Sequence, residues 1–385
     1  TVALSHCGFA DPLQMELRER GGQAAVHGGF QLKREQWQGD KTAVIVCDMW
    51  DSHHCRNAVI RVKELAPRVN LLLRKVRSEG GMVIHAPSSC MEPYREHPAR
   101  LRAQKSPKAT NLPADINSWL HWINEKEKRA GYPIDHSDGG EDDDPEEHAQ
   151  WVEKLKAMGR NPQSPWLRQI ESIQIDPDRD FISDNGEECW NILEQKGIKN
   201  IMLVGVHANM CVLGRPFGLR QLARNGKNVV LVRDLTDTMY NPEQHPRVSH
   251  FAGTDLIVAH IEKYVCPTVS SEQVLGGKSF VFKKDSRPKI LFVIGEREYQ
   301  TKESLSAFAA SELTSRYRCE FIVAGDGENN FEGIIDSLKD TDAMFLSVRR
   351  RSPPASQLTA IRKFIESGKP VIGIRTSSHA FSLRG

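Results

Sequence analysis

The sequence predicts an α/β protein in which a mostly parallel sheet is covered by helices on both faces and is followed by a second, smaller α/β unit. Apolar, largely β-branched runs alternate with helix-like stretches between about 41 and 270, and strands that are apolar throughout are typical of such sheets. A polar, lysine-rich segment over 271–287 then interrupts this rhythm. The chain of 385 residues also exceeds the length of one average domain. We therefore expect an irregular segment over 1–40, a first domain over 41–270, a linker over 271–287 and a second domain over 288–385.

The first domain begins with the strand "TAVIVCDMW", in which Asp48 follows the apolar run. A helix over about 57–78 and the strand "MVIHAP" complete a β-α-β unit. Residues 88–170 break the alternation, and a long insertion of this kind commonly covers or lines a site. The alternation resumes with the helix "EECWNILEQKG", the strand "NIMLVGV", a helix over about 210–225, the strand "NVVLVRDLTDT" and the helix "DLIVAHIEKYV".

The second domain repeats the pattern on a smaller scale. Its expected strands are "KILFVIG", "CEFIVAG", "AMFLSVRR" and "PVIGIRT", and its expected helices lie near 304–317, near 331–339 and after 353–354.

Composition excludes several classes of partner. The net charge of +2 gives no bulk electrostatic footprint for nucleic acid or an anionic membrane. No apolar run reaches the ~20 residues of a membrane span, and the eight cysteines show no C-x-x-C spacing, which argues against a disulfide framework or a structural metal. The expected partners are a small-molecule substrate and, as an option, a second copy of the chain. Since the chain starts at Thr1, the compartment is left open between the cytoplasm and export with a leader removed.

Cys211 is the candidate nucleophile, and Asp48 is its candidate base. Both follow apolar strands, and the carboxyl ends of parallel strands meet at one edge of a sheet. A cysteine near a helix N-terminus has a lowered thiol pKa, and the N–H groups of 207–211 could form an oxyanion hole. The alternative is ordinary packing, because free cysteine is among the most buried residue types.

The stretches "AVIVCDMWDSH" and "GVHANMCVLGRPFG" resemble the isochorismatase-like cysteine hydrolases, the superfamily of nicotinamidases and isochorismatases. Gly205, Val206, Cys211 and Val212 match the motif G-V-x-T-x-x-C-V of that superfamily, and Asp48 matches its catalytic aspartate. The resemblance covers about 41–270. It implies a three-layer α/β/α hydrolase that attacks a small-molecule amide, or an ether or ester, through the cysteine and needs no cofactor.

Three positions depart from the family pattern. Where the family carries a catalytic lysine, the stretch "IQIDPDRDFIS" places Asp176 or Asp178. The motif threonine is Ala208, and a common aspartate is Asn209. The missing lysine removes the cation that would hold a thiolate beside Asp48. This loss motivates an alternative, in which the protein is a catalytically silent binding protein for a small or carbohydrate-related molecule.

A working hydrolase would need another positive group beside Cys211. Arg215 is favoured, because a residue four positions along a helix lies on the same face. Arg179, His207, His85 and a bound metal are the other options. The binding residues expected around this site are Trp50, His85, His207, Ala208, Asn209 and Arg215.

No metal ligands are assigned, although a divalent metal is kept as an option. Adjacent His53 and His54 are expected to point in different directions. The acidic run over 138–147 is either a solvated loop or a cation site. The tryptophans of the insertion either pack it internally or line the site; they are Trp119, Trp122, Trp151 and Trp166.

The second domain resembles the trehalose-utilisation (ThuA-like) family, which has a class I glutamine-amidotransferase-like fold. The resemblance rests on "ILFVIGEREYQTKESL", "AMFLSVRRR" and "GKPVIGIRTSSHAF". His379 lies in the family's R-T-x-S-H-A-F loop, and Ser377 or Ser378 lies near the position where amidotransferases carry a cysteine. Since the sequence ends shortly after His379, we expect about half of such a domain and a longer parent protein.

Overall fold

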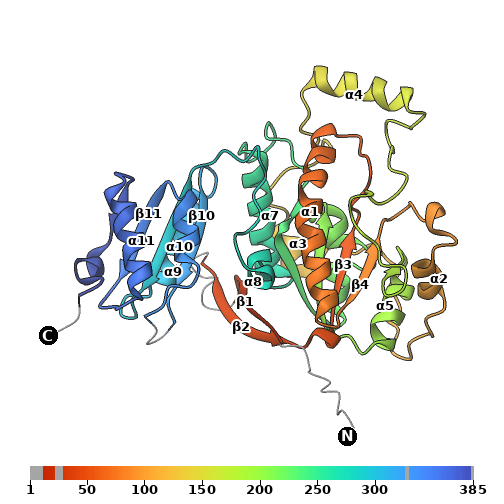
Figure 1. Cartoon of the computed structure of the whole chain (residues 1–385). Helices are drawn as coiled ribbons and strands as arrows, with labels where there is room; N and C mark the ends of the chain where they lie inside the picture. Colours follow the sequence, from red (N-terminus) through yellow and green to blue (C-terminus); the bar gives the residue numbers. More distant parts are fainter. Residues whose placement is uncertain (1–11, 22–28, 326–328, 383–385) are drawn as a thin grey trace, which may run out of the picture.

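A computed structural model describes residues 12–21, 29–325 and 329–382 (Figure 1). Its larger part is built on an eight-stranded sheet with the strand order β2-β1-β8-β7-β6-β3-β4-β5. Strands β3 to β8 run parallel, so the expected α/β class is confirmed. These strands are β3 (Thr42–Cys47), β4 (Met82–Ala86), β5 (Phe181–Ile182), β6 (Asn200–Val206), β7 (Asn228–Asp237) and β8 (Thr268–Val269).

Helices cover both faces of this sheet, because the inner strands are apolar on both sides. In β3, Ala43, Ile45 and Cys47 face one core, whereas Val44 and Val46 face the other. The first core is closed by α5 (Gly186–Gln195), α6 (Leu219–Arg224) and α7 (His250–Tyr264), and the second by α1 (Arg56–Ser78) and α8 (Ser271–Leu275). In the part of the chain that the structure describes, no helix could cross a lipid bilayer.

The expectation of an irregular segment over 1–40 is wrong for its described part. Strands β1 (Leu13–Glu19) and β2 (Gln31–Trp37) form an antiparallel pair at the edge of the sheet, and β1 also pairs antiparallel with β8. Leu13, Met15 and Leu17 alternate with more exposed residues and are buried. This alternation is the usual sign of a strand with one buried face.

The segment expected to be a free linker, 271–287, is instead packed on the first sheet. It contains α8, and Phe280 and Phe282 join the core that α1 covers. Arg68 of α1 donates to the Ser271 hydroxyl at 2.9 Å. The polar composition of this segment reflects its outer face.

The insertion between β4 and β5 carries three short helices, α2 (Pro98–Gln104), α3 (Glu125–Ala130) and α4 (Pro145–Ala157). Glu127 of α3 is fully buried and anchors the insertion, since it accepts hydrogen bonds from Arg220 at 2.6 Å and contacts His260 at 2.9 Å. In Figure 1, α4 lies above the upper end of α1.

The second unit has a parallel four-stranded sheet with the order β10-β9-β11-β12. One face packs on α10 and α11, and the other packs on α9. Arg287 links the two units through Asp255 at 2.8 Å and the Thr314 carbonyl at 3.1 Å. The elements are β9 (Lys289–Gly295), α9 (Thr301–Phe308), β10 (Arg318–Val323), α10 (Ile334–Ser337), β11 (Ala343–Val348), α11 (Ala355–Glu366) and β12 (Val371–Gly373).

Short helices of other types occur throughout. They are the 3-10 helices η2 (Gly39–Lys41), η3 (Glu92–Tyr94), η6 (Leu338–Asp340) and η7 (Arg375–His379), and the π-helices η4 (Ala208–Val212) and η5 (Ala309–Leu313).

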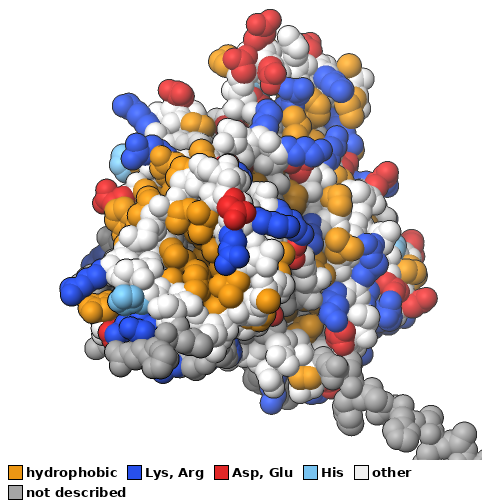
Figure 2. All heavy atoms as spheres, turned by 60° about the vertical axis from the view of Figure 1, so that its left-hand side comes forward, with side chains coloured by type: hydrophobic (Ala, Val, Ile, Leu, Met, Phe, Trp, Pro, Cys, Tyr) orange, Lys and Arg blue, Asp and Glu red, His pale blue; other side chains and the backbone are white. Residues whose placement is uncertain are grey.

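Figure 2 brings the end of the molecule formed by the second unit forward and shows hydrophobic side chains gathered on its surface. All three residues of the edge strand β12 are exposed. The large apolar side chains exposed in this unit are Tyr299, Phe308, Ile335, Ile365, Val371 and Ile372.

Candidate active site

Asp48 directly follows β3 and lies at the carboxyl edge of the first sheet. Its backbone has a φ of 47°, a left-handed conformation that is costly for a residue with a side chain and that is common at functional sites. The side chain is fully buried. Its Oδ1 accepts the backbone N–H of Ser88 at 2.8 Å, which fixes the carboxylate in place.

Cys211 lies on a tight turn rather than on the long helix expected over 210–225. The π-helix η4 follows β6 almost directly, and α6 covers only Leu219–Arg224. The Val212 N–H donates to the His207 carbonyl at 3.2 Å, and the Met210 N–H donates to the same carbonyl at 3.0 Å. π-type turns of this kind are frequent at functional sites.

Gly205 allows β6 to approach β3 beside the site. Its φ is 108°, and a Cβ at this position would lie 2.0 Å from the Cys47 carbonyl oxygen. Only glycine fits here, because a side chain would meet a backbone atom that cannot move aside.

Arg215 joins the two candidate catalytic groups. Its Nε donates to Asp48 Oδ2 at 3.1 Å, and both side chains influence the pKa of the Cys211 thiol. The backbone N–H of Arg215 donates to the Cys211 carbonyl at 3.0 Å, which sets the spacing of one helical turn. Arg215, the cation favoured from the sequence, therefore lies beside Asp48 at the carboxyl edge of the sheet.

The charges of this group are strongly perturbed by burial. Burial raises the pKa of Asp48, and Arg215 offsets part of that shift. Burial likewise raises the pKa of the Cys211 thiol well above its usual range; the Asp48 carboxylate adds to the shift and Arg215 opposes it. The thiol is 8% exposed, so it is protonated at neutral pH in this closed arrangement.

The aspartates found in place of the family lysine do not reach this group. Asp176 accepts hydrogen bonds from the backbone N–H groups of Asp178 and Arg179 in an exposed turn. The Arg179 side chain pairs with Asp176 at 2.8 Å, so Arg179 is not the cation beside Cys211. Asp176 therefore does not place a second carboxylate beside Cys211, where its negative charge would oppose a thiolate.

His85, an expected binding residue, belongs to a different buried cluster. Its Nε2 contacts Asp180 Oδ2 at 3.0 Å, its Nδ1 contacts Gln169 Oε1 at 3.0 Å, and Asp180 also pairs with Arg77. Both ring nitrogens are therefore engaged within the protein. The expectation that His85 binds substrate or supplies the cation is not supported.

His207 cannot supply the cation either. Burial lowers its pKa to about 3, so the ring is neutral. Its ring lies 5.0 Å from that of His53, and its Nε2 has no hydrogen-bond partner among the described residues. The rings of His53 and His54 lie 4.0 Å apart, which corrects the expectation that they diverge. Residues 51–55 form neither a helix nor a strand, so the regular side-chain directions do not apply.

The two motif substitutions are structural in this arrangement. Asn209 donates to the Met239 carbonyl at 2.8 Å and accepts the Met239 N–H at 2.9 Å, which ties the Cys211 turn to the segment after β7. Ala208 is fully buried in the core of the sheet.

Tryptophans of the insertion contact the edge of the site. Trp50 stacks on Trp166 with ring centroids 4.6 Å apart and donates its indole N–H to the Ser88 carbonyl at 3.1 Å. The Arg215 guanidinium lies 5.4 Å from the Trp119 ring. From the sequence, Trp119 and Trp166 could either pack the insertion or line the site. No sequence pattern pointed to Ser88, whose backbone N–H donates to Asp48.

The acidic run over 138–147 is bound to α1 rather than fully solvated. Asp143 accepts the N–H groups of Arg56 and Asn57 at 2.6 and 2.7 Å, so it caps the helix. Asp142 forms a two-bond ion pair with Arg61 at 2.8 and 2.9 Å.

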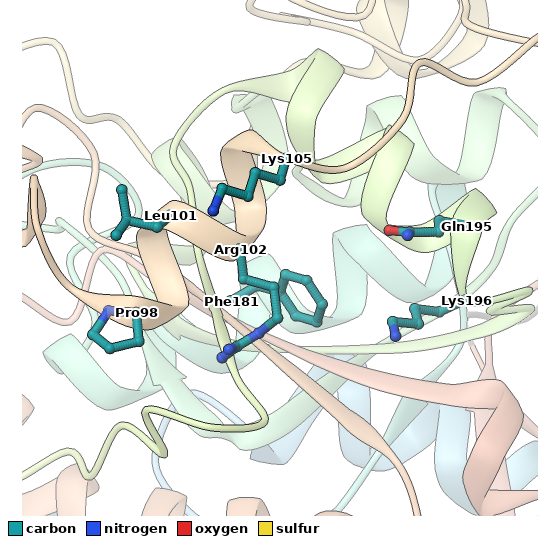
Figure 3. A pocket seen from close by; sticks show the side chains of 7 residues that line it. All are labelled: Pro98, Leu101, Arg102, Lys105, Phe181, Gln195 and Lys196. Carbon is teal, nitrogen blue, oxygen red and sulfur yellow. The ribbon is translucent and has the colours of Figure 1, made fainter.

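A cavity of about 450 Å³ lies away from Cys211, between α2, β5 and the end of α5 (Figure 3). Arg102 on its wall donates to the carbonyls of Pro177 and Asp180 and lies 5.3 Å from the Phe181 ring. This arginine therefore serves to hold the chain before β5.

Comparisons with known proteins identify the family of the chain. No curated protein matches the chain significantly. Among solved structures, a cysteine hydrolase from Pseudomonas syringae pv. phaseolicola 1448A shows 15% identity over 62% of this chain and 93% of its own, with a TM-score of 0.36. An N-carbamoylsarcosine amidase from Thermoplasma acidophilum shows 14% identity over 60% and 97%, with a TM-score of 0.31. The isochorismatase domain model matches residues 42–254, more than half of the 385 residues, so the chain belongs to the isochorismatase family.

Proposed function

We propose that the protein is a cysteine hydrolase that cleaves the C–N bond of a small-molecule amide or, less favourably, a C–O bond of an ether or ester. The observation that carries the proposal is that Arg215 donates to Asp48 at a buried sheet edge, and that both groups influence the pKa of the Cys211 thiol. Arg215 is a permanent cation, and it takes the electrostatic place of the family lysine. Membership of the isochorismatase family supports the same chemistry.

In the proposed reaction, Asp48 takes the proton of Cys211 as sulfur attacks the carbonyl carbon. The raised pKa of Asp48, caused by its burial, makes this carboxylate a stronger base. The amide N–H groups of Ala208, Asn209 and Cys211 are the candidate donors to the oxyanion. Asp48 then returns the proton to the leaving nitrogen as the C–N bond breaks. Water, deprotonated by Asp48, releases the acyl group and regenerates the thiol.

A catalytically silent binding protein is the second candidate. It is favoured by the low exposure of Cys211 and by burial, which raises the thiol pKa. In this case the second unit, for which we propose a ThuA-like domain, would contribute recognition of a carbohydrate-related molecule.

Alkylation with iodoacetamide at neutral pH separates the two functions. For a hydrolase we expect Cys211 to react faster than the other six cysteines that the structure describes, and we expect Cys211→Ser to abolish turnover across a panel of small amides and esters. The matched control is Cys266→Ser, because Cys266 is also buried but has no acid or base of the site beside it. Equal reactivity of Cys211 and Cys266, together with ligand binding but no turnover, would establish the binding protein.

A further inference from the structure

Ser88, in the turn after β4, carries a buried hydroxyl group that has no fixed partner. The residue is 2% exposed, and its Oγ is shielded from solvent and makes no hydrogen bond with any of the described residues. Buried polar atoms normally have such a partner, because leaving a hydroxyl without one costs free energy. The packing of the turn therefore does not explain why a serine stands at this position.

The backbone of the turn holds Ser88 against the carboxylate of Asp48. The Ser88 N–H donates to Asp48 Oδ1 at 2.8 Å, and the Ser88 carbonyl accepts the indole N–H of Trp50 at 3.1 Å. The next residue, Ser89, has a φ of 64°, which is local strain of the kind found at functional sites. The hydroxyl oxygen is separated from the bonded nitrogen by only Cα and Cβ, so the turn keeps it beside Asp48.

The Ser88 side chain acts on Asp48 in the direction that a base requires. Burial raises the pKa of this carboxyl, whereas Arg215, Cys211 and Ser88 lower it. A buried carboxyl without such partners favours its protonated form, which cannot accept the thiol proton. The charged and titratable groups that interact electrostatically with Asp48 are Arg215, Cys211, Cys47 and Cys90.

We propose that Ser88 is a positioning residue for Asp48 in the hydrolysis: its hydroxyl donates a hydrogen bond to the charged carboxylate and accepts one when the carboxyl holds the proton. This inference rests on the proposed function. A serine hydroxyl suits both states, since it has one donor and two acceptor sites and turns about its C–O bond. As sulfur attacks, the Cys211 proton passes to Asp48, and the Ser88 proton is not transferred. A hydroxyl without a fixed partner fits a group whose partner changes during the reaction.

The test uses p-nitrophenyl acetate, because p-nitrophenol released in the first turnover reports acylation of Cys211. In the parent we expect this rate to fall in acid as Asp48 becomes protonated. Ser88→Ala removes the hydroxyl but keeps the backbone N–H, so the pKa of Asp48 should rise and the acid limb should move to higher pH by about one unit. Ser88→Gly should move it equally, whereas Ser88→Thr, which keeps the hydroxyl, should stay close to the parent. The matched control is Ser89→Ala, since Ser89 is exposed.

An acid limb that stays in place in Ser88→Ala and Ser88→Gly would overturn the proposal, and so would an equal loss of rate at every pH, which is the effect of a merely structural serine. A Ser88→Thr variant that melts at the parent's temperature but has the acid limb of Ser88→Ala would also contradict it. Failure of the hydrolase assignment looks different: the parent releases no p-nitrophenol in a first turnover, or the release persists in Cys211→Ser. Asp48 then has no thiol proton to accept, and the two proposals fail together.

Discussion

Asp48 and Asp237 are both buried at the carboxyl edge of the same sheet, but their pKa values are shifted in opposite directions. Asp48 follows β3, and Asp237 is the last residue of β7. Both are fully buried and both contact an arginine. Burial would raise the pKa of each, but Arg61 and His250 reverse this effect and lower the pKa of Asp237. Arg215 only partly offsets the burial of Asp48, whose pKa remains raised.

The difference lies in the number and geometry of the partners. Asp237 has Arg61 at 2.6 Å and His250 at 2.8 Å, whereas Asp48 has Arg215 at 3.1 Å and a thiol that can itself lose a proton. A fully paired buried carboxylate stabilises the fold in its charged form. A partly paired one is held ready to exchange a proton, which is what a general base requires.

The largest effect we expect is on catalysis at Asp48. Asp48→Asn should lower kcat/KM on the order of 10⁴-fold, because the thiol then has no base. Asp237→Asn, assayed at a temperature where it remains folded, should retain most of the activity. Steady-state kinetics on the amide that the parent turns over measures both, and equal losses in the two variants would remove the functional distinction between them.

For stability we expect the reverse order, with the larger loss in Asp237→Asn and the smaller change in Asp48→Asn. Asp237→Asn removes the carboxylate that contacts both Arg61 and His250 and leaves Asp142 as the remaining carboxylate beside them, which should lower the free energy of unfolding by about 3 kcal/mol. Asp48→Asn should change it by less than about 1 kcal/mol, since the folded protein already disfavours the charged form of Asp48. Urea unfolding at pH 7 compares them, and a similar cost in both variants would contradict the prediction.

The effects of Asp237→Asn and Asp48→Asn on the free energy of unfolding should also depend on pH in opposite ways. The lowered pKa of Asp237 means that its stabilisation is present above the unfolded value of 3.8 and is lost as the pH falls through the folded pKa. The raised pKa of Asp48 means that its contribution is present below 3.8 and is lost as the pH rises through the folded pKa. Asp237→Asn should therefore approach the parent in acid, and Asp48→Asn should gain on the parent above pH 3.8. Unfolding curves between pH 3 and 7 would show parallel lines if the two carboxylates were equivalent.

Arg215→Met should raise the pKa of the Cys211 thiol by a unit or more, about 1.4 kcal/mol, because it removes the cation that lowers this pKa. Alkylation rate against pH measures the shift. Arg215→Lys, which keeps the charge, should recover part of it, and Arg179→Met is the matched control because Arg179 pairs with Asp176 in an exposed turn. An unchanged thiol pKa in Arg215→Met would exclude this arginine.

The smallest effect that we expect comes from Trp119, whose ring lies against the Arg215 guanidinium. Trp119→Leu removes the aromatic ring 5.4 Å from the guanidinium, which should cost about 0.5–1 kcal/mol of cation–π interaction and raise the thiol pKa by less than one unit. The same alkylation profile measures it. A shift as large as that of Arg215→Met would mean that Trp119 acts by another route.

The sequence by itself determined the alternating β-α order, the buried strands β3, β4, β6 and β7, and the placement of Asp48 and Cys211 after parallel strands, because periodicity and strand-end chemistry are local properties. The sheet pairing of β1 and β2 was signalled locally by the alternation of Leu13, Met15 and Leu17, but their polar outer faces concealed it. The α/β pattern of the second unit was also evident from the sequence, since its strands are mostly apolar.

Only the tertiary structure decided which charged groups meet. Arg77, Asp180 and His85 close one cluster, and the acidic loop caps α1, although a sequence pattern gives no sign of either contact. The reason is physical: a pKa depends on burial and on the distance to neighbouring charges, and both are set by residues that lie far apart in the chain. Arg215 four positions after Cys211 could be proposed from helical spacing, but its bond to Asp48, 167 positions away, exists only in the folded protein.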